Sequence, residues 1–272
     1  MSGASGVGKT MLAKITAKEN GGELYRIHAP SLNKSADLSI MLLSMKDRDI
    51  LFIDEIHALS RESAETLFEA MSEQHISVAS ERGETPVTLD IADISVIGAT
   101  TDHNRLPEAF RNRFVRHLRL QEYSVNELIL ILKNSLTTQI TSETQSAIEC
   151  ITDDDLSEIA ARSRGRARNA LSMLNVLIDH ALCRLDKVSC ESVFAELGVG
   201  PHGVNQDDRD YLKCFSSARP VGLTTIAGTT RLDRNYIENT IEPFLISLGI
   251  IEKTARGRIV NRQRAAMVGV AV

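Results

Sequence analysis

The chain has 272 residues, 43% hydrophobic and 25% charged, a composition typical of a globular protein with more than one domain. Its formal charge of −5 and 4% aromatic content, without Trp, disfavour nucleic-acid binding through overall charge or base stacking. No apolar run approaches the roughly 20 residues of a membrane span. The chain also has no signal-peptide pattern, and its four cysteines have no metal-ligand spacing, so we expect a cytoplasmic protein with no membrane attachment.

The first 120 residues alternate apolar, strand-like runs with amphipathic helices. This alternation predicts an α/β fold with a largely parallel sheet. The candidate strands are residues 24–28, 50–54 and 94–99. Residues 50–53 are continuously apolar, as expected for a strand that helices cover on both faces.

Residues 3–10 fit the phosphate-binding pattern G-x-x-x-x-G-K-[ST] in full. Glycines let such a loop close around phosphates, and the helix that begins near Lys9 points its positive end at them. We expect Lys9 to reach the β- and γ-phosphates of ATP and Thr10 to place its hydroxyl on Mg²⁺. The alternative is a chance glycine-rich turn.

Two acids, Asp54 and Glu55, follow the second predicted strand, at the end where open α/β sheets bind ligands. Asp54 would hold Mg²⁺, directly or through water, and Glu55 would orient or deprotonate the attacking water. By themselves two acids after a strand are a weak signal, because strands often end in solvated acids. Their neighbour His57 is more often a helix-surface or core residue than a catalytic one.

Hydroxyls and arginines after the third strand complete the pattern. Thr101 would lie near the γ-phosphate and sense its loss, unless it simply caps the strand. Arg111 and Arg113 follow a turn that contains Pro107. An arginine delivered to a neighbouring subunit's γ-phosphate accelerates hydrolysis by about 10³–10⁵-fold in known cases. We predict Arg113 to be such a finger; the alternative is surface charge.

From about residue 121 to 197 the pattern is helical. Ser124 and Glu127 form a capping box at the start of the first helix. Acids that follow Thr152 begin the second helix, a third is expected over 167–185, and a fourth ends before Gly198.

Arg168 lies near the start of the third predicted helix. A cation there could reach back over the nucleotide and couple hydrolysis to movement of the helical zone. The alternative is a surface salt bridge worth about 0–1 kcal/mol.

The C-terminal part begins with a linker-like stretch. Residues 198–205 are rich in Gly and contain one Pro. The zone from 206 onward contains short helices and a turn-rich basic hairpin near its end. Without further context this hairpin would be interpreted as a basic, solvated turn.

The order of these motifs resembles that of an AAA+ ATPase, and more narrowly that of the RuvB family, bacterial motors of Holliday-junction branch migration. The C-terminal zone makes the resemblance specific, because its residues 220–223, 237–238, 242–246, 248–249 and 253–258 resemble the winged-helix domain of that family. The resemblance runs from residue 1 to about 262. It implies an AAA+ parallel-sheet core over 1–120, an all-α lid over 121–197, a linker over 198–205 and a winged-helix DNA-binding domain over 206–272.

Carried over by position, the resemblance also implies roles for individual residues. Those expected to contact ATP are Gly6, Gly8, Lys9, Thr10, Met11, Tyr123 and Arg168. Mg²⁺ would be held by Thr10 and Asp54, and the catalytic residues would be Glu55, Thr101 and Arg113. DNA would be contacted by Lys253, Arg256 and Arg258. The family has Arg at the first of these hairpin positions, and Lys keeps the charge but loses bidentate geometry.

Two segments depart from the family pattern. Family members carry several dozen residues before the P-loop, including the strand that feeds it, whereas only Met1 and Ser2 precede Gly3 here. We therefore expect this first, central strand to be missing, which leaves its neighbours without partners unless another segment fills the gap. Residues 78–89 occupy the place of the hairpin that contacts RuvA, and they are shorter and more polar, which bears on the partner contact more than on the ATPase site.

Together these patterns predict an ATP-dependent DNA translocase subunit that drives branch migration in recombination and repair. It would work as a homo-oligomeric ring, a hexamer by family analogy, and would grip four-way junction or double-stranded DNA through phosphates. A RuvA-like junction-binding protein would be its partner. Two alternatives remain: another AAA+ DNA-processing ATPase, such as a clamp or helicase loader, and a truncated, non-catalytic DNA-binding remnant.

Overall fold

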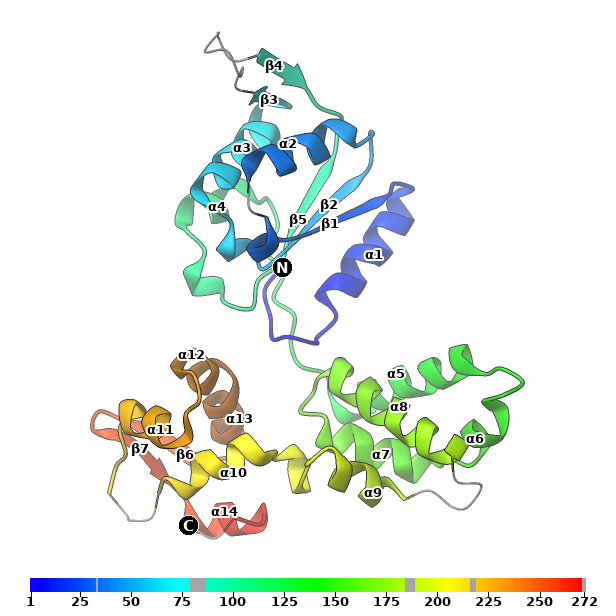
Figure 1. Cartoon of the computed structure of the whole chain (residues 1–272), viewed down its shortest axis with the longest axis vertical. Coiled ribbons are helices and arrows are strands. Elements are labelled where there is room, and N and C mark those ends of the chain that lie inside the picture. The colour runs from blue at the N-terminus through cyan, green and yellow to red at the C-terminus, as the bar shows by residue number, and fades with distance from the viewer. Residues whose placement is uncertain (33, 79–86, 184–188, 216–218, 271–272) are drawn as a thin grey trace. The chain divides into compact units, whose positions relative to one another are not determined.

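A computed structural model describes residues 1–32, 34–78, 87–183, 189–215 and 219–270 (Figure 1). The chain divides into two compact units, Met1–Glu122 and Tyr123–Val272. No helix in the part of the chain described is long and apolar enough to cross a membrane.

The first unit is built on a three-stranded parallel sheet with the order β1–β2–β5. These strands are β1 (Leu24–His28), β2 (Ile50–Asp54) and β5 (Ser95–Gly98). The central strand β2 is buried from Ile50 to Ile53, because helices cover both of its faces. The predicted α/β fold with a parallel sheet is confirmed.

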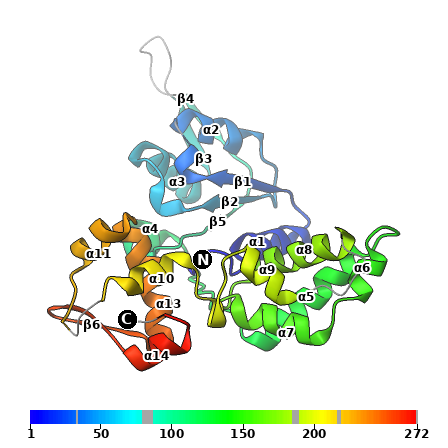
Figure 2. The same cartoon turned by 60° about the horizontal axis from the view of Figure 1, so that its bottom comes forward.

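Alternate side chains of β2 point to opposite faces of the sheet and belong to different apolar clusters. Phe52 packs with Ala13 of α1, whereas Leu51 and Ile53 belong to a larger cluster with Leu67 of α3. Figures 1 and 2 show α1 apart from α2 and α3 across the sheet. The helices of this unit are α1 (Lys9–Asn20), α2 (Ser35–Ser44), α3 (Arg61–Glu73) and α4 (Glu108–Arg113). A separate antiparallel hairpin joins β3 (His75–Val78) to β4 (Val87–Asp90).

Residues Met1–Gly3 lie beside the end of β5, where the expected first strand belongs. The Thr100 amide donates to the Met1 carbonyl (3.0 Å), and the Gly3 amide donates to the Thr100 carbonyl (3.2 Å). On its other side, Ser2 exchanges backbone hydrogen bonds with Leu118 and Leu120, both at 2.8 Å. These three residues therefore supply partners to the end of β5 and connect it to residues 118–120.

The second unit begins with a helical layer. Its helices are α5 (Val125–Gln139), α6 (Gln145–Glu149), α7 (Asp153–Arg162), α8 (Ala167–Cys183) and α9 (Cys190–Glu196). The predicted capping box at Ser124 is present, and Thr152 forms another at the start of α7. Leu132, Leu174 and Phe194 lie in the shared core of these helices.

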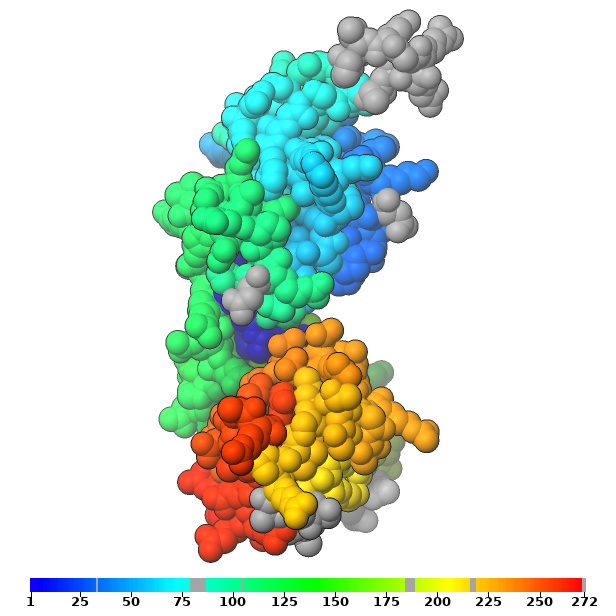
Figure 3. All heavy atoms as spheres, turned by 90° about the vertical axis from the view of Figure 1, so that its left-hand side faces the viewer, coloured from blue at the N-terminus to red at the C-terminus, as the bar shows by residue number. Residues whose placement is uncertain are grey.

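The rest of the second unit contains short helices and a hairpin around a separate core. Its elements are α10 (Gln206–Lys213), α11 (Leu223–Thr230), α12 (Arg234–Tyr236), a π-helical turn (Ile237–Ile241), α13 (Glu242–Ser247), β6 (Ile251–Thr254), β7 (Gly257–Val260) and α14 (Arg262–Met267). Val221 pairs with Arg258 and adds a third strand position beside the hairpin. Tyr211, Ile237 and Leu245 are fully buried in this core. Figure 3 shows the described residues between 198 and 270, in yellow to red, as one closely packed body.

Candidate functional site

The loop before α1 has the backbone that a phosphate-binding loop needs. Gly6 and Gly8 have φ angles of 85° and 93°, values that glycine adopts without the strain other residues incur. Helix α1 then begins at Lys9, with Thr10 half-buried in its first turn and Met11 exposed.

The ammonium of Lys9 lies inside this loop. The residue is 7% exposed, and its Nζ donates to the carbonyl oxygens of Gly3 (2.6 Å) and Ala4 (2.9 Å). These carbonyl oxygens stand in for the phosphate oxygens that such a lysine binds. The loop therefore has the charge and the backbone shape that fit a nucleotide phosphate.

The sheet brings the predicted acids and Thr101 to this loop. Asp54 ends β2, and Glu55 follows it in a left-handed conformation (φ 52°). Because β2 and β5 are parallel, their carboxyl ends meet at one edge, where the Gly3 amide binds the Thr100 carbonyl. The start of the P-loop, Asp54, Glu55 and Thr101 thus gather at one end of the sheet.

Glu55 is held by Thr101, in the segment that follows β5, and lies close to His57, in the turn that follows β2. Its carboxylate accepts hydrogen bonds from the Thr101 amide (3.0 Å) and hydroxyl (2.9 Å). His57 Nδ1 lies 3.3 Å from Glu55 Oε2 and 2.8 Å from Thr100 Oγ1. From the sequence a helix-surface or core role was favoured for His57 over a catalytic one, and its position two residues after Glu55 was the signal for a place near the site.

The residues present fit Mg²⁺ only if the nucleotide phosphates and water supply the rest of its ligands. No cluster of three or more His, Cys, Asp or Glu side chains among the described residues could hold a metal by itself. Magnesium commonly uses one or two protein oxygens together with substrate phosphates and water. Thr10 and Asp54, which lie at the ends of the P-loop and β2, are suited to that role.

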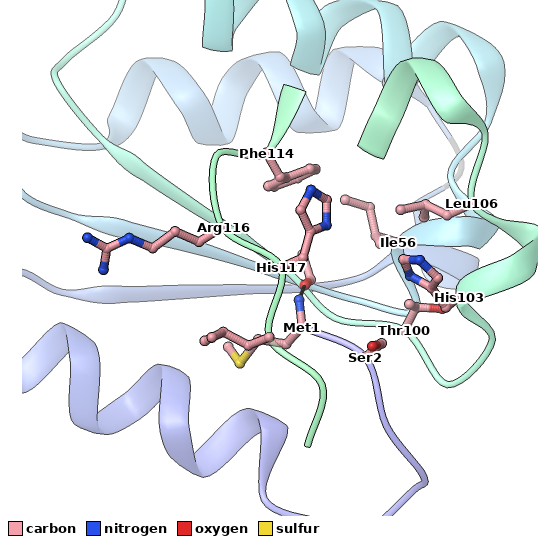
Figure 4. A pocket seen from close by; sticks show the side chains of 11 residues that line it. Met1, Ser2, Ile56, Thr100, His103, Leu106, Phe114, Arg116 and His117 are labelled. Atoms are coloured by element: carbon pink, nitrogen blue, oxygen red, sulfur yellow. Dashed lines mark hydrogen bonds between the residues drawn. The ribbon is translucent and has the colours of Figure 1, made fainter. Parts of the chain in front are cut away.

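A small cavity of about 40 Å³ lies beside this edge of the sheet (Figure 4). Its walls include Ser2, Ile56, Thr100 and Phe114, and Figure 4 shows the imidazoles of His103 and His117 nearby. A space of this size admits a few water molecules and not a nucleotide. It is therefore not the ATP site.

The predicted finger, Arg113, ends α4 and contacts α3 of its own chain. Its Nη1 donates to the Phe68 carbonyl (3.2 Å) and to the Ser72 hydroxyl, and its guanidinium lies 4.8 Å from the centroid of the Phe68 ring. The use of Arg113 on a neighbouring subunit stays a prediction.

Tyr123 and Arg168 belong to the second unit. The Tyr123 amide donates to the Gly165 carbonyl (2.8 Å), and its side chain is partly buried against the helical core. Arg168 lies exposed in the first turn of α8. Their contact with a nucleotide also stays a prediction.

The basic hairpin β6–β7 is anchored by a buried acid. Glu242, fully buried at the start of α13, accepts from Lys253 Nζ (2.6 Å) and from Arg258 Nε (2.7 Å). Arg258 is 15% exposed at its side chain, whereas Arg256 lies exposed in the turn. Of the three predicted DNA contacts, Arg256 and Lys253 are exposed and Arg258 is the least accessible.

Burial by itself would raise the pKa of Glu242, but hydrogen bonds from Arg258 and Lys253 hold that pKa below its ordinary value. Tyr211 adds a third donor, its hydroxyl lying 3.1 Å from Glu242 Oε1. Glu242 is therefore an ionised anchor for the hairpin.

The proposed partner segment, residues 78–89, is described only at its ends. Val78 pairs with Val87, and residues 79–86 lie outside the described part of the chain. The prediction of an altered partner contact is therefore untested.

A phosphate-binding loop that leads into a helix beside a parallel sheet is the arrangement of a P-loop ATPase of the AAA+ class. Residues 1–120 match the family model described as the Holliday junction DNA helicase RuvB P-loop domain. Residues 201–267 match that of the RuvB C-terminal winged helix domain.

Whole proteins and solved structures agree with these matches. The chain is 38% identical over 274 aligned positions to the Holliday junction branch migration complex subunit RuvB of Helicobacter pylori (strain Shi470), covering 98% of this chain and 79% of the relative. It is also 38% identical to the corresponding subunit of Campylobacter jejuni (strain RM1221), covering 96% of this chain and 78% of that relative. The solved structure of the Thermotoga maritima RuvB Holliday junction branch migration motor superimposes with a TM-score of 0.81 at 28% identity, covering 100% of this chain and 86% of that one. The chain belongs to the RuvB family.

Proposed function

We propose that this chain is an ATP-hydrolysing motor subunit that drives branch migration of four-way DNA junctions. The observation that carries the proposal is the edge of the parallel sheet, where the P-loop, Asp54, Glu55 and Thr101 meet in a chain that also has a RuvB-type winged-helix domain. The winged helix disfavours a clamp or helicase loader.

Each residue of the edge has a defined task. When bound, MgATP supplies the phosphoanhydride bond that is broken. Lys9 exchanges the Gly3 and Ala4 carbonyls for phosphate oxygens, and Thr10 and Asp54 hold Mg²⁺. Glu55 accepts a hydrogen bond from the attacking water and orients it, while Thr101 holds the Glu55 carboxylate.

A homo-oligomeric ring, which we propose to be hexameric, would complete the site. To act on a neighbour's γ-phosphate, Arg113 has to leave Phe68 and Ser72 of its own chain. Exchanging these neutral contacts for the negatively charged oxygens of the γ-phosphate favours that movement. Each active site would then combine the P-loop of one subunit with Arg113 of its neighbour. A mixture of Arg113→Ala and Lys9→Ala subunits should therefore recover part of the ATPase activity that each variant lacks alone.

DNA would be bound through phosphates by the hairpin, with Arg256 and Lys253 as the leading contacts. Arg258 would contribute mainly by holding the hairpin, unless a phosphate displaces Glu242. We further propose a RuvA-like junction-binding protein as a partner, which the hairpin β3–β4 would contact, and action in the cytoplasm where the chromosome lies.

The test is ATPase activity with and without a four-way junction, using linear duplex DNA of the same length as the control. The parent chain should hydrolyse ATP faster with the junction, and Lys9→Ala should abolish turnover. Equal stimulation by linear DNA would favour a loader-type ATPase. No turnover at any protein concentration, together with intact DNA binding, would overturn the motor and favour a non-catalytic DNA-binding protein.

A further inference from the structure

His57 lies at the centre of a hydrogen-bond cluster that links the end of β5 to the acid after β2. It occupies the 3₁₀ turn Ile56–Ala58, and its side chain is 10% exposed. Its Nδ1 atom is 2.8 Å from Thr100 Oγ1 and 3.3 Å from Glu55 Oε2. A histidine that caps a helix surface would be solvated, whereas this one is enclosed against two residues of the candidate site.

The neighbouring hydrogen bonds decide which imidazole nitrogen carries the proton. The Thr100 hydroxyl donates to the Asp102 carbonyl (3.0 Å), so its single hydrogen is already used and its oxygen is an acceptor for His57. The carboxylate of Glu55 accepts hydrogen bonds and does not donate them when ionised. With the Thr100 hydroxyl donating to Asp102, a hydrogen on Nδ1 would bond to Thr100 Oγ1 and lie beside the Glu55 carboxylate, which is 3.3 Å from Nδ1.

The same carboxylate has a second set of donors. Thr101 donates its amide to Glu55 Oε2 (3.0 Å) and its hydroxyl to Oε1 (2.9 Å). Thr101 and His57 approach Glu55 from different segments, the residues after β5 and the 3₁₀ turn. Glu55 follows β2 in a left-handed conformation, and the two hydrogen bonds from Thr101 hold its carboxylate in place.

We propose that His57 is a positioning residue for ATP hydrolysis, which acts with Thr101 to fix the Glu55 carboxylate through its Nδ1 hydrogen. The inference rests on the proposed function in assigning Glu55 to the attacking water. His57 itself touches neither water nor nucleotide in this role. Its loss should therefore lower kcat and leave the KM for ATP nearly unchanged.

Three substitutions of one residue separate this role from simple packing. His57→Asn places an amide N–H near the position of Nδ1, His57→Gln places it near Nε2, and His57→Leu keeps bulk without a donor. We expect kcat to fall about tenfold in the Leu and Gln variants, the scale of one hydrogen bond to a charged group, and less than threefold in the Asn variant. Circular dichroism melts of all three variants should be recorded as a control, so that the kcat values are compared only between folded proteins.

Equal kcat values for the parent and His57→Leu chains would overturn the inference. So would equal losses in the Asn and Leu variants, because a merely structural histidine would not be rescued through one nitrogen position.

A readout without turnover keeps this test separate from the motor proposal. The ¹⁵N chemical shifts of His57 in the nucleotide-free chain should identify Nδ1 as the protonated nitrogen. A hydrogen on Nε2 alone would overturn the inference even if the chain hydrolyses ATP. If the parent chain does not hydrolyse ATP but Nδ1 carries the hydrogen, the motor proposal fails and the positioning geometry stands.

Discussion

A buried ion pair joins the helical layer to the C-terminal body of the second unit, and its loss should destabilise that junction strongly. Arg164 donates to Asp208 and to the Gly203 carbonyl (2.8 Å), and its guanidinium lies 3.9 Å from the centroid of the Phe244 ring. The side chains of Arg164 and Asp208 are 8% and 0% exposed. Breaking such a pair is costly, because neither buried side chain can exchange its partner for water.

Arg164→Met keeps the aliphatic bulk of the side chain and removes its charge. Asp208 then remains buried, and among the described residues the Asn205 backbone amide, 2.8 Å away, still donates to its carboxylate. Removing one partner of a buried pair costs about 3–5 kcal/mol, because the other charge is left without compensation. We expect the opening free energy of α10 to fall by that amount at pH 7, measured by hydrogen exchange of its amides.

The double variant Arg164→Met, Asp208→Asn is the matched control, since it removes the stranded charge. It should recover most of the loss while still lacking the arginine. A loss below about 1 kcal/mol in the single variant would refute the reasoning, because it would mean that water reaches Asp208. A double variant as unstable as the single one would assign the effect to packing against Phe244.

The pH dependence of the stability loss in the Arg164→Met variant tests the same reasoning independently. Burial raises the pKa of Asp208 above its ordinary value of 3.8, and Arg164 and the Asn205 amide offset part of that rise. Without Arg164 the pKa rises further, so the folded state binds a proton more readily than the unfolded chain. The deficit of the Met variant should therefore shrink as pH falls from 7 toward 4, after correction for intrinsic exchange rates.

Two further predictions concern the hairpin. The pKa of Glu242 is held below its ordinary value of 4.5, so its contribution to the stability of the fold is present above pH 4.5 and should be lost as the pH falls below that value. Circular dichroism between pH 6 and 3 should show this loss. A Glu242→Gln chain with the same pH profile as the parent would contradict the prediction. Arg256→Ala should weaken binding to all duplex sequences alike and reduce the slope of log K against log salt by about 1, measured by fluorescence anisotropy. An unchanged slope would mean that Arg256 meets no phosphate, and Lys213→Ala, which removes an exposed lysine of α10, serves as the charge-matched control.

The sequence by itself determined the features that depend on local pattern. The strands over 24–28 and 50–54 and the capping box at Ser124 occur at the predicted residues, because a covered strand and a helix start are encoded by adjacent side chains. The P-loop was equally clear, since its glycines and Lys9 are contiguous.

Tertiary structure decided the features that depend on residues distant in the chain. His57 enters the candidate site because the segment after β5 brings Thr100 to it across 43 positions. Arg258 points to Glu242, 16 positions away, rather than to solvent. In each case a charge or hydroxyl has several possible partners, and only packing, which excludes water from some of them, selects one.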